Sequence, residues 1–427
     1  MEQEKAIEYA IRGHNIFLTG KAGTGKTYTL KKIIKELREL GKVVAVTAST
    51  GIAGVHLGGS TIHSWAGIGI KTKLSQDDLF KIANNRFSRE RIFRADTLVI
   101  DEISMLHDFR FDMVEEVCRF VKRMDMIFGG MQVIVSGDFF QLPPVNRDKL
   151  KNYCFNSGAW KNINMKTCYL QKIYRQQGDE EFIGILNNIR KNSVTESQRR
   201  RLDGLSENKK YYDMGVNLYC KNVSVDIENA VQLSRIKSES FISRMTAEGL
   251  EFKVIELKKN CLAPETLIIK EGAKVMILVN DIPKMRYCNG TLGEVVGFSI
   301  DEEVIVIKSY KTGEYLEIGK FTWEIEEYSP KEHRDVVVAA VTQFPIKLAW
   351  ALTVHKSQGA TFDYVNLDLR DAFEENMGYV ALSRVTSLDG LYLSGYKDEA
   401  LFVDDYVIEH DKVFREESIM NEEDIEF

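Results

Sequence analysis

The residues best suited to chemistry are a lysine and a threonine at the end of a glycine-rich stretch. The stretch Gly20-Lys21-Ala22-Gly23-Thr24-Gly25-Lys26-Thr27 fits the pattern G-x-x-x-x-G-K-[ST]. Glycines let backbone N–H groups turn toward one anion, and the start of a helix favours negative charge. In such a cradle Lys26 reaches the β- and γ-phosphates, and Thr27 offers its hydroxyl to Mg²⁺. The spacing therefore predicts a binding site for a nucleoside triphosphate.

Two carboxylates and one amide follow two other apolar runs. Asp101 and Glu102 come directly after Thr97–Ile100, and Gln141 follows Met131–Ser136. Parallel strands present their ligands at their carboxyl ends, so we expect these side chains at one edge of a sheet. There Asp101 is suited to hold Mg²⁺, Glu102 to polarise the attacking water, and Gln141 to reach the γ-phosphate. By spacing alone, Gln141 is explained equally well as a solvated amide in a turn.

The elements that must position these groups form an alternating pattern from residue 1 to about 144. After the glycine-rich stretch, apolar residues recur at helical spacing, and four short apolar runs read as buried strands. The expected strands are Asn15–Thr19, Val43–Thr47, Thr97–Ile100 and Met131–Ser136. Alternation of this kind predicts a parallel sheet with helices on its faces. Residues 61–94 interrupt the rhythm and predict a small insertion with a short helix near Asp77–Asn85.

The second half of the chain begins with a similar pattern and then changes. A helix is expected at Phe182–Ile189 and a strand at Val216–Cys220, before a series of short runs separated by turn residues. Such a series predicts a small β-barrel. Its expected strands are Phe252–Leu257, Lys274–Val279, Gly293–Phe298, Glu303–Ser309, Glu314–Ile318 and Val336–Val341. Helix–strand alternation returns with Ala349–Lys356 and Glu375–Val385.

These patterns predict an α/β protein with two α/β domains. The first domain is expected at 1–60 and 95–168, with the small insertion at 61–94. The second is expected at 169–250 and 342–415, interrupted by the barrel at 251–341. Residues 416–427 are rich in Glu and Asp, which predicts an acidic, mobile tail.

Composition narrows the class of protein. The 427 residues contain 44% hydrophobic and 28% charged residues, typical of a globular protein, and no apolar run reaches the length of a membrane span. The six cysteines form no C-x-x-C pair, which argues against a zinc ribbon and for reduced thiols. The first residues lack a targeting pattern, so we expect a cytoplasmic protein. A net charge of −6 neither indicates nor excludes nucleic-acid binding, because local basic patches matter more.

Several segments resemble, in order, the motifs of the petite-integration-frequency (PIF-one) DNA helicases of superfamily one. They are Thr47–Ala53, Ser60–Trp65, Val99–Leu106, Asp108–Val133, Gly137–Val145, Tyr174–Gln177, Ala351–Thr361 and Tyr379–Val385. With Gln3, the matches reach from residue 3 to about 391. The resemblance implies two RecA-like P-loop NTPase domains with an inserted SH3-like β-barrel. Only two residues precede Gln3, where the family has a longer lead-in, so we expect either a minimal core of bacterial or phage type or a trimmed chain.

For the nucleotide, the resemblance adds residues that spacing alone does not single out. It implies that Gln3 reads the adenine edge and that Arg175 and Arg384 reach the γ-phosphate from the second domain. A guanidinium there neutralises charge on the transferring phosphoryl group. By spacing alone, surface ion pairs are the better explanation for both arginines. Gly359 is expected to let the backbone approach the nucleotide.

For nucleic acid, the resemblance implies a track of polar residues with aromatic side chains beside it. The track residues are Thr50, His63, Thr353, His355, Lys356 and Ser357. Trp65, Phe139 and Phe140 are candidates for stacking on bases. Burial in the core is the ordinary explanation for such aromatics, and for Phe139 it is at least as good.

The resemblance implies an ATP-dependent DNA helicase that moves 5′→3′ on single-stranded DNA, with ATP and Mg²⁺ as cofactors. Single-stranded DNA and single/double-strand junctions are the expected partners, with G-quadruplexes and RNA–DNA hybrids as further substrates. Such enzymes act in DNA repair, recombination and telomere maintenance. We expect a monomer that does not bind membranes. The alternative is a nucleotide-gated DNA-binding switch ATPase that never unwinds, whereas a small-molecule kinase leaves Ala351–Thr361 and Tyr379–Val385 unexplained.

Overall fold

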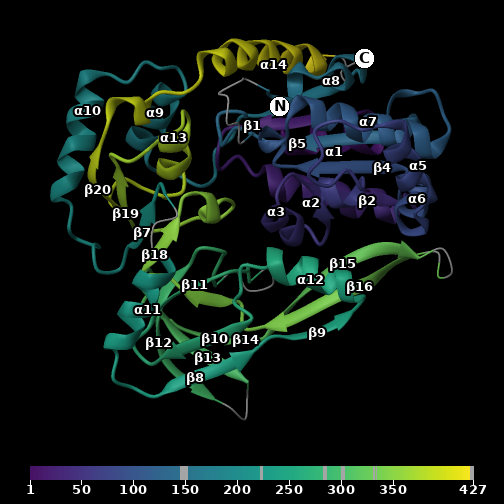
Figure 1. Ribbon diagram of the computed structural model, residues 1–427. Coiled ribbons are helices and arrows are strands. Elements are labelled where there is room, and N and C mark those ends of the chain that lie inside the picture. The colour runs from purple at the N-terminus through teal and green to yellow at the C-terminus, as the bar shows by residue number, and fades with distance from the viewer. Residues whose placement is uncertain are drawn as a thin grey trace.

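The chain folds into two α/β domains and a β-rich region that is inserted in the second (Figure 1). The computed structural model describes residues 1–144, 152–221, 225–281, 286–299, 303–329, 332 and 334–423. In Figure 1 the first domain lies at the right, the second at the left, and the β-rich region below both. The parts of the chain that carry the predicted nucleotide residues therefore lie side by side, although they are far apart in sequence.

The first domain is built on a six-stranded parallel sheet with the strand order β3-β2-β4-β5-β1-β6. Its strands are β1 (Ile16–Gly20), β2 (Val44–Ala48), β3 (Ser60–Thr61), β4 (Thr97–Asp101), β5 (Gln132–Ser136) and β6 (Lys166–Leu170). Its helices are α1 (Gln3–Ile11), α2 (Lys26–Glu39), α3 (Gly51–His56), α4 (Ile62–Trp65), α5 (Gln76–Asn84), α6 (Arg86–Arg94), α7 (Asp108–Lys122) and α8 (Gly158–Asn162). Every residue of β1 and β4 is buried, as expected for strands covered on both faces.

The structure confirms the four predicted strands of this sheet to within a residue at each end. The two edge strands were missed for different reasons. β3 has only two residues, too few to leave a pattern, whereas β6 mixes polar and apolar side chains. The insertion contains the predicted short helix as α5, which begins with a capping box between Ser75 and Asp78.

The second domain contains a four-stranded parallel sheet with the strand order β18-β7-β19-β20. Its strands are β7 (Val216–Tyr219), β18 (Ala351–Thr353), β19 (Val365–Leu369) and β20 (Leu391–Tyr396). Its helices are α9 (Glu180–Ile189), α10 (Glu196–Asp203), α11 (Val225–Arg235), α13 (Met377–Leu382) and α14 (Asp405–Glu423). One buried apolar cluster contains residues of both α/β domains, among them Phe17, Phe139, Tyr379 and Phe414.

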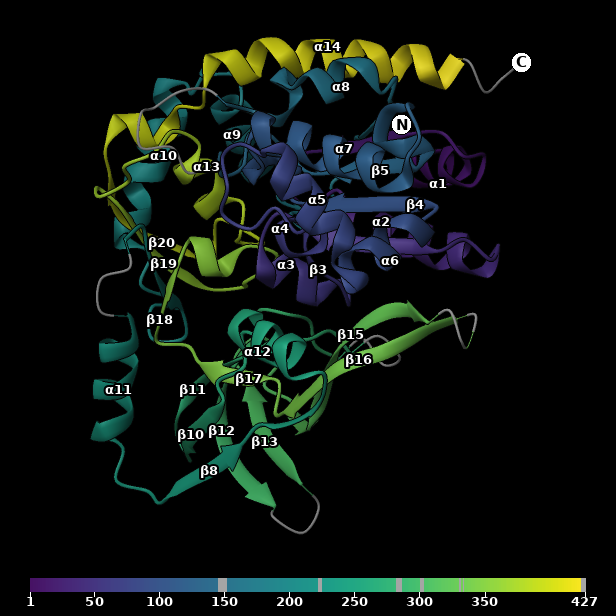
Figure 2. The same cartoon turned by 45° about the vertical axis from the view of Figure 1, so that its right-hand side comes forward.

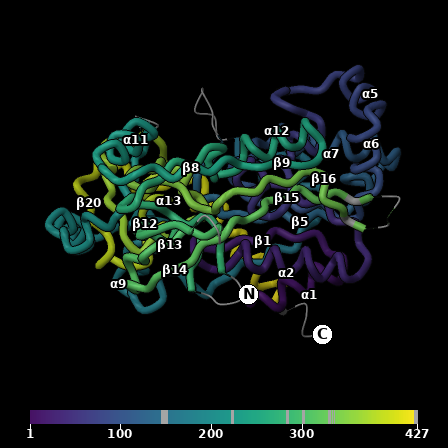
Figure 3. The backbone as a smooth tube through the Cα atoms, turned by 90° about the horizontal axis from the view of Figure 1, so that it is seen from below, coloured from purple at the N-terminus to yellow at the C-terminus, as the bar shows by residue number. Residues whose placement is uncertain are grey.

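The β-rich region contains a five-stranded antiparallel sheet, β14-β13-β12-β11-β17, beside a β10-β8 pair and a β15-β16-β9 sheet. Its elements are β8 (Ser240–Arg244), β9 (Thr246–Gly249), α12 (Glu251–Asn260), β10 (Thr266–Lys270), β11 (Lys274–Ile277), β12 (Leu292–Ser299), β13 (Val304–Ser309), β14 (Tyr315–Gly319), β15 (Phe321–Ser329), β16 (Arg334–Gln343) and β17 (Ile346–Leu348). Figure 3, seen from below, shows β15 and β16 running out as a long hairpin beneath the first domain.

Two expectations for this region are wrong. Phe252–Leu257 is not a strand but part of helix α12, in which Lys253 and Leu257, four residues apart, are the buried positions. The short apolar run of this segment fits both the two-residue repeat of a strand and the 3.6-residue repeat of a helix. The packing of the segment on α3 and β16 favours the helix. The boundary at 250 is also too late, because β8 and β9 pair with β10 and β16.

The tail prediction is wrong as far as Glu423. Residues 416–423 continue helix α14, which crosses the top of the first domain in Figures 1 and 2, while 424–427 lie outside the described residues. The Glu417 carboxylate accepts a hydrogen bond from Thr167 Oγ1 at 2.6 Å, and Ser418 Oγ accepts one from the Tyr169 backbone N–H at 3.0 Å. These bonds tie the acidic segment to edge strand β6. Within the described part of the chain, no helix has the length and apolar character needed to cross a lipid bilayer.

Candidate active site

The glycine-rich stretch forms the predicted turn between β1 and α2. Gly23 and Gly25 have φ values of 82° and 84°, a left-handed conformation that a side chain disfavours. Lys26 Nζ donates hydrogen bonds to the carbonyls of Gly20 at 2.8 Å and Lys21 at 3.0 Å. Burial lowers the pKa of Lys26, although nearby carboxylates act in the opposite direction. The ammonium group therefore lies across the loop, and Thr27 is exposed at the start of α2.

The two carboxylates lie where β4 ends. Asp101 is buried, and Glu102 follows it in a left-handed conformation with φ 51° and ψ 44°. Burial raises the pKa of both groups, and the charge of Asp101 helps to raise that of Glu102 to about 7. Two carboxylates held together away from water favour a cation beside them. No cluster of three metal-binding side chains exists among the described residues, so an ion here would take further ligands from phosphate and water.

The structure brings both predicted arginines from the second domain to this edge. Arg384 is 2% exposed, and its Nη2 donates a hydrogen bond to Gln141 Oε1 at 2.9 Å. Arg175 Nη1 donates one to the Ser383 carbonyl at 2.9 Å. Burial, and then the charge of Arg384, lowers the pKa of Arg175 to about 9. Two cations that repel each other, Arg384 buried and Arg175 half-buried, lie beside Glu102 and Lys26 and form a site that an anion would stabilise.

The loop also touches the segment that contains Arg175. The Tyr174 backbone N–H donates to the Gly23 carbonyl at 2.8 Å, and a Cβ on Gly23 would lie 2.7 Å from the Cβ of Arg175. Gln3 Nε2 donates to the Thr24 carbonyl at 3.2 Å, which places that amide against the loop. Gly359 is different, because it is exposed with a φ of 77° and has no neighbour within 4 Å of a Cβ position.

A buried ion pair that the sequence does not predict lies beside this site. Arg190 Nη1 lies 2.9 Å from both carboxylate oxygens of Asp138, and the two residues are 3% and 1% exposed. The same nitrogen donates to the Tyr379 hydroxyl at 3.1 Å, and Nη2 donates to the Tyr169 hydroxyl at 2.9 Å. A charged residue directly after the apolar helical pattern Phe182–Ile189 was the available signal, but nothing in the spacing indicated its partners.

The predicted DNA residues fall into two groups. Thr353 and Ser357 are buried: Thr353 Oγ1 accepts from the Lys356 backbone N–H at 3.2 Å, and Ser357 Oγ donates to the Val354 carbonyl at 2.7 Å. These hydroxyls hold the turn rather than face solvent. The remaining four are partly or fully exposed, namely Thr50, His63, His355 and Lys356. Burial, and then Arg110 and His107, lowers the pKa of His63 to about 4, so this side chain is neutral at pH 7.

Two residues that are predicted to stack on bases are buried in this structure. Trp65 is 5% exposed and belongs to the core of the first domain. Phe140 is 2% exposed and lies under the Arg190 guanidinium, whose carbon is 3.8 Å from the ring centre. Phe139 is buried too, 5.6 Å from Phe17 between ring centres, so the core explanation holds for it.

Helix α12 of the β-rich region lies against the segments predicted to bind DNA (Figure 2). Ser64, next to His63, donates a hydrogen bond from Oγ to Glu256 Oε2 at 3.2 Å. At Gly51, next to Thr50, an added Cβ would lie only 1.8 Å from Asn260 Oδ1. In this arrangement α12 covers part of the predicted track.

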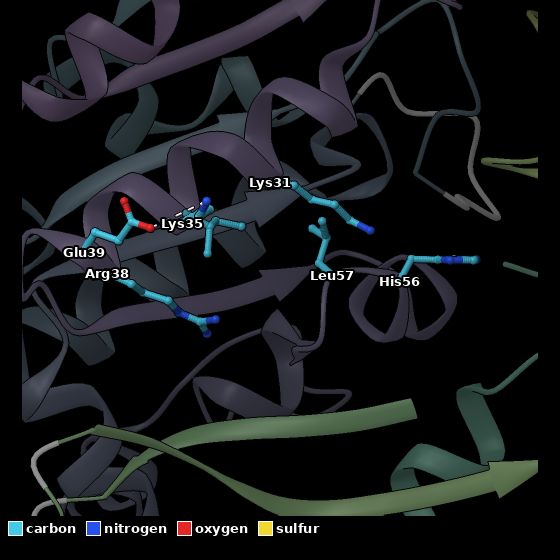
Figure 4. A pocket seen from close by; sticks show the side chains of 7 residues that line it. Lys31, Lys35, Arg38, Glu39, His56 and Leu57 are labelled. Atoms are coloured by element: carbon cyan, nitrogen blue, oxygen red, sulfur yellow. Dashed lines mark ion pairs between the residues drawn. The ribbon is translucent and has the colours of Figure 1, made fainter. Parts of the chain in front are cut away.

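A cavity of about 470 Å³ opens on another surface, between α2 and α3 (Figure 4). It is lined by Lys31, Ile34, Lys35, Arg38, Glu39, His56 and Leu57. Arg38 forms an ion pair with Glu326 of β15 at 2.9 Å. None of the predicted nucleotide or DNA residues lines this cavity, which separates it from the site described above.

Comparison with known proteins gives a consistent result along the chain. The family model for PIF1-like helicases matches residues 1–200, and that for the 2B domain of DNA helicase Pif1 matches residues 251–298. The ATP-dependent DNA helicase Pif1 of Psychrobacter sp. is 37% identical, over 98% of this chain and 71% of its own length. The chain belongs to the PIF1-like helicase family.

Solved structures agree with that assignment. Bacteroides sp. Pif1 in complex with ADP-AlF4 is 31% identical and covers 98% of this PIF1-like helicase and 97% of its own chain, with a TM-score of 0.84. Bacteroides Pif1 bound to single-stranded DNA has the same identity and the same coverage but a TM-score of 0.60. The predicted family and the fold of two RecA-like domains with a β-rich insertion are confirmed. The PIF1-like helicase is an ATP-hydrolysing enzyme by class, as predicted.

Proposed function

We propose that this PIF1-like helicase hydrolyses ATP between its two α/β domains and moves 5′→3′ along single-stranded DNA, opening the duplex ahead. One observation carries the proposal. Arg384 of the second domain reaches Gln141 of the first at 2.9 Å, and its charge lowers the pKa of Glu102 against the effect of burial. Hydrolysis at such a shared site changes the contacts between the domains, which is what a motor requires. The direction of travel rests on the family resemblance.

Each group at the site has a defined part in hydrolysis. Lys26 binds the β- and γ-phosphates, and Glu102 orients the attacking water. Thr27 and Asp101 have the oxygen donors that Mg²⁺ prefers, and they would hold it beside the phosphates, where it neutralises charge. Arg384, with Arg175 and Gln141, stabilises the charge on the transferring phosphoryl group. Gln3 of α1, whose side chain bonds the Thr24 carbonyl of the loop, recognises the base of ATP.

The DNA track follows the partly exposed residues of the two α/β domains. Lys356 is exposed and His355 half-buried at the end of β18, which suits contacts with a phosphate backbone. His63 is neutral, so it contributes hydrogen bonds rather than charge. Because α12 rests on the segments around Thr50 and His63, DNA binding requires the β-rich region to move. The lower TM-score against the DNA-bound relative supports this requirement.

The decisive experiment measures ATP hydrolysis and strand displacement by the same preparation. We expect oligo-dT to stimulate the ATPase, and duplexes with a 5′ single-stranded tail to open while those with a 3′ tail do not. Lys26→Ala should abolish both activities and serves as the control for contaminating enzymes. Stimulated hydrolysis without displacement would identify a DNA-binding switch ATPase instead, and hydrolysis without stimulation would exclude a DNA motor.

The same preparations test the remaining parts of the proposal. We propose a monomer that acts on single-stranded DNA and on single/double-strand junctions in the cytoplasm, and light scattering without DNA measures its mass directly. Forks, G-quadruplexes and RNA–DNA hybrids with equal 5′ tails rank the substrates. Affinity for oligo-dT should fall as salt rises, because phosphate contacts release counterions. Affinity that does not depend on salt contradicts a backbone track.

A further inference from the structure

A tyrosine of the second domain touches the phosphate loop directly. The Tyr379 hydroxyl oxygen lies 3.2 Å from the backbone nitrogen of Ala22 and accepts its hydrogen bond. Tyr379 belongs to α13, is 2% exposed, and is one of the largest fully enclosed side chains of the protein. Burial raises its pKa, so the hydroxyl keeps its proton at neutral pH. A neutral oxygen of the second domain therefore contacts the turn that is predicted to hold the phosphates, in addition to the bond between Tyr174 and Gly23.

Arg190 fixes the position of that oxygen. Its Nη1 donates to the Tyr379 hydroxyl at 3.1 Å while it binds the Asp138 carboxylate at 2.9 Å. Asp138 stands three residues before Gln141, and its carbonyl accepts the Gln141 backbone N–H at 2.8 Å. The hydroxyl is thus held from two sides, by the loop through Ala22 and by the Arg190–Asp138 pair. Buried polar groups with several partners are rigid, because every alternative position leaves a group unsatisfied.

Tyr379 is also coupled to Arg384, which is predicted to reach the γ-phosphate. The backbone N–H of Ser383 donates to the Tyr379 carbonyl at 2.9 Å, and Arg384 Nε donates to the Val380 carbonyl at 3.1 Å. The tyrosine and Arg384 are therefore parts of one short hydrogen-bonded segment. A shift of this segment relative to the loop moves the guanidinium relative to the γ-phosphate.

We propose that Tyr379 is a positioning residue for ATP hydrolysis, whose hydroxyl sets the distance between the phosphate loop and Arg384. The inference rests on the proposed function of Arg384 and extends it to a residue outside the predicted nucleotide-binding set. A displacement of about 1 Å in such a site can cost about 100-fold in rate. Because Arg384 acts mainly in the transition state, the loss should appear in kcat and not in the KM for ATP.

The test compares Tyr379→Phe with Tyr169→Phe. Both changes remove one hydroxyl that Arg190 holds, from rings that are 2% and 3% exposed. The Tyr169 hydroxyl donates to Asp411 Oδ1 of α14 at 3.0 Å. Among the described contacts it has no bond to the phosphate loop. A purely structural role predicts similar losses of thermal stability and similar kinetics in the two variants. Purified full-length proteins are assayed for ATPase with saturating oligo-dT, and for affinity toward ADP and ADP·AlF4.

For Tyr379→Phe we expect kcat to fall about tenfold with the KM for ATP changed less than about twofold. Affinity for ADP·AlF4, which imitates the transferring phosphoryl group, should fall about tenfold while affinity for ADP stays constant. Tyr169→Phe should keep kcat within about twofold of the wild type. Equal kcat in the two variants, or an unchanged ADP·AlF4 affinity in Tyr379→Phe, overturns the inference. A wild type that hydrolyses no ATP refutes the proposed function, and the inference with it.

Discussion

Replacing Arg384 by alanine tests the shared site most directly. The guanidinium is 2% exposed and donates to Gln141 Oε1 and to the Val380 carbonyl. An arginine that stabilises a transferring phosphoryl group is worth about 10³–10⁵ in rate, or about 4–7 kcal/mol of activation free energy. The unpaired Gln141 amide costs about 1–3 kcal/mol of folding stability. The effect on the rate should therefore exceed the effect on the fold.

The assay measures steady-state ATPase with saturating oligo-dT, together with the affinities for ADP and for DNA. Arg370→Ala is a matched control, because Arg370 lies in the same domain with its side chain 64% exposed and paired only with Asp368 among the described ion pairs. Gln141→Ala and the double variant Arg384→Ala/Gln141→Ala complete a double-mutant cycle. Since the two side chains touch, their effects on the barrier should be less than additive.

Three results would refute this reasoning. Arg384→Ala hydrolysing ATP within about tenfold of the wild-type rate would show that the guanidinium does not act on the phosphoryl group. A variant that loses only DNA affinity would place Arg384 in the DNA track. Additive effects in the cycle would mean that its contact with Gln141 has no part in hydrolysis.

Three further predictions concern stability. Arg190→Met leaves Asp138 buried without its partner and should lower the free energy of unfolding by about 3–5 kcal/mol, and adding Asp138→Leu should restore part of it in urea titrations. Phe140→Ala should lower the free energy of unfolding by about 3–5 kcal/mol, because the side chain is buried. If the folded fraction of this variant also loses affinity for DNA, that result contradicts a purely buried role. Burial, and then Lys31 and Lys347, lowers the pKa of His56 to about 4 from its ordinary 6.5. Stability from this group is complete above about pH 6.5 and lost as the pH falls through 4, so His56→Gln should flatten the melting-temperature profile there.

Local features of the sequence were enough to place together the residues that are predicted to bind the nucleotide. The glycines, Lys26 and Thr27 form one turn, and Asp101 and Glu102 end one strand, so their spacing already contains their geometry. The same holds for most strands, whose buried runs need no partner to be recognised. The backbone of a single element sets the distances between residues that are close in sequence. A sequence pattern therefore describes their geometry directly.

Contacts between distant parts of the chain needed the tertiary structure. Arg190 meets Asp138 and Tyr379 across 52 and 189 residues, and no pattern of either segment selects those partners. Burial of Trp65 and Phe140, and the docking of 416–423 on β6, are likewise decided by the surfaces that close over them. An aromatic or charged side chain has the same local pattern whether it faces a base, a core or an ion partner. Its role is chosen by desolvation and by its neighbours, which exist only once the chain has folded.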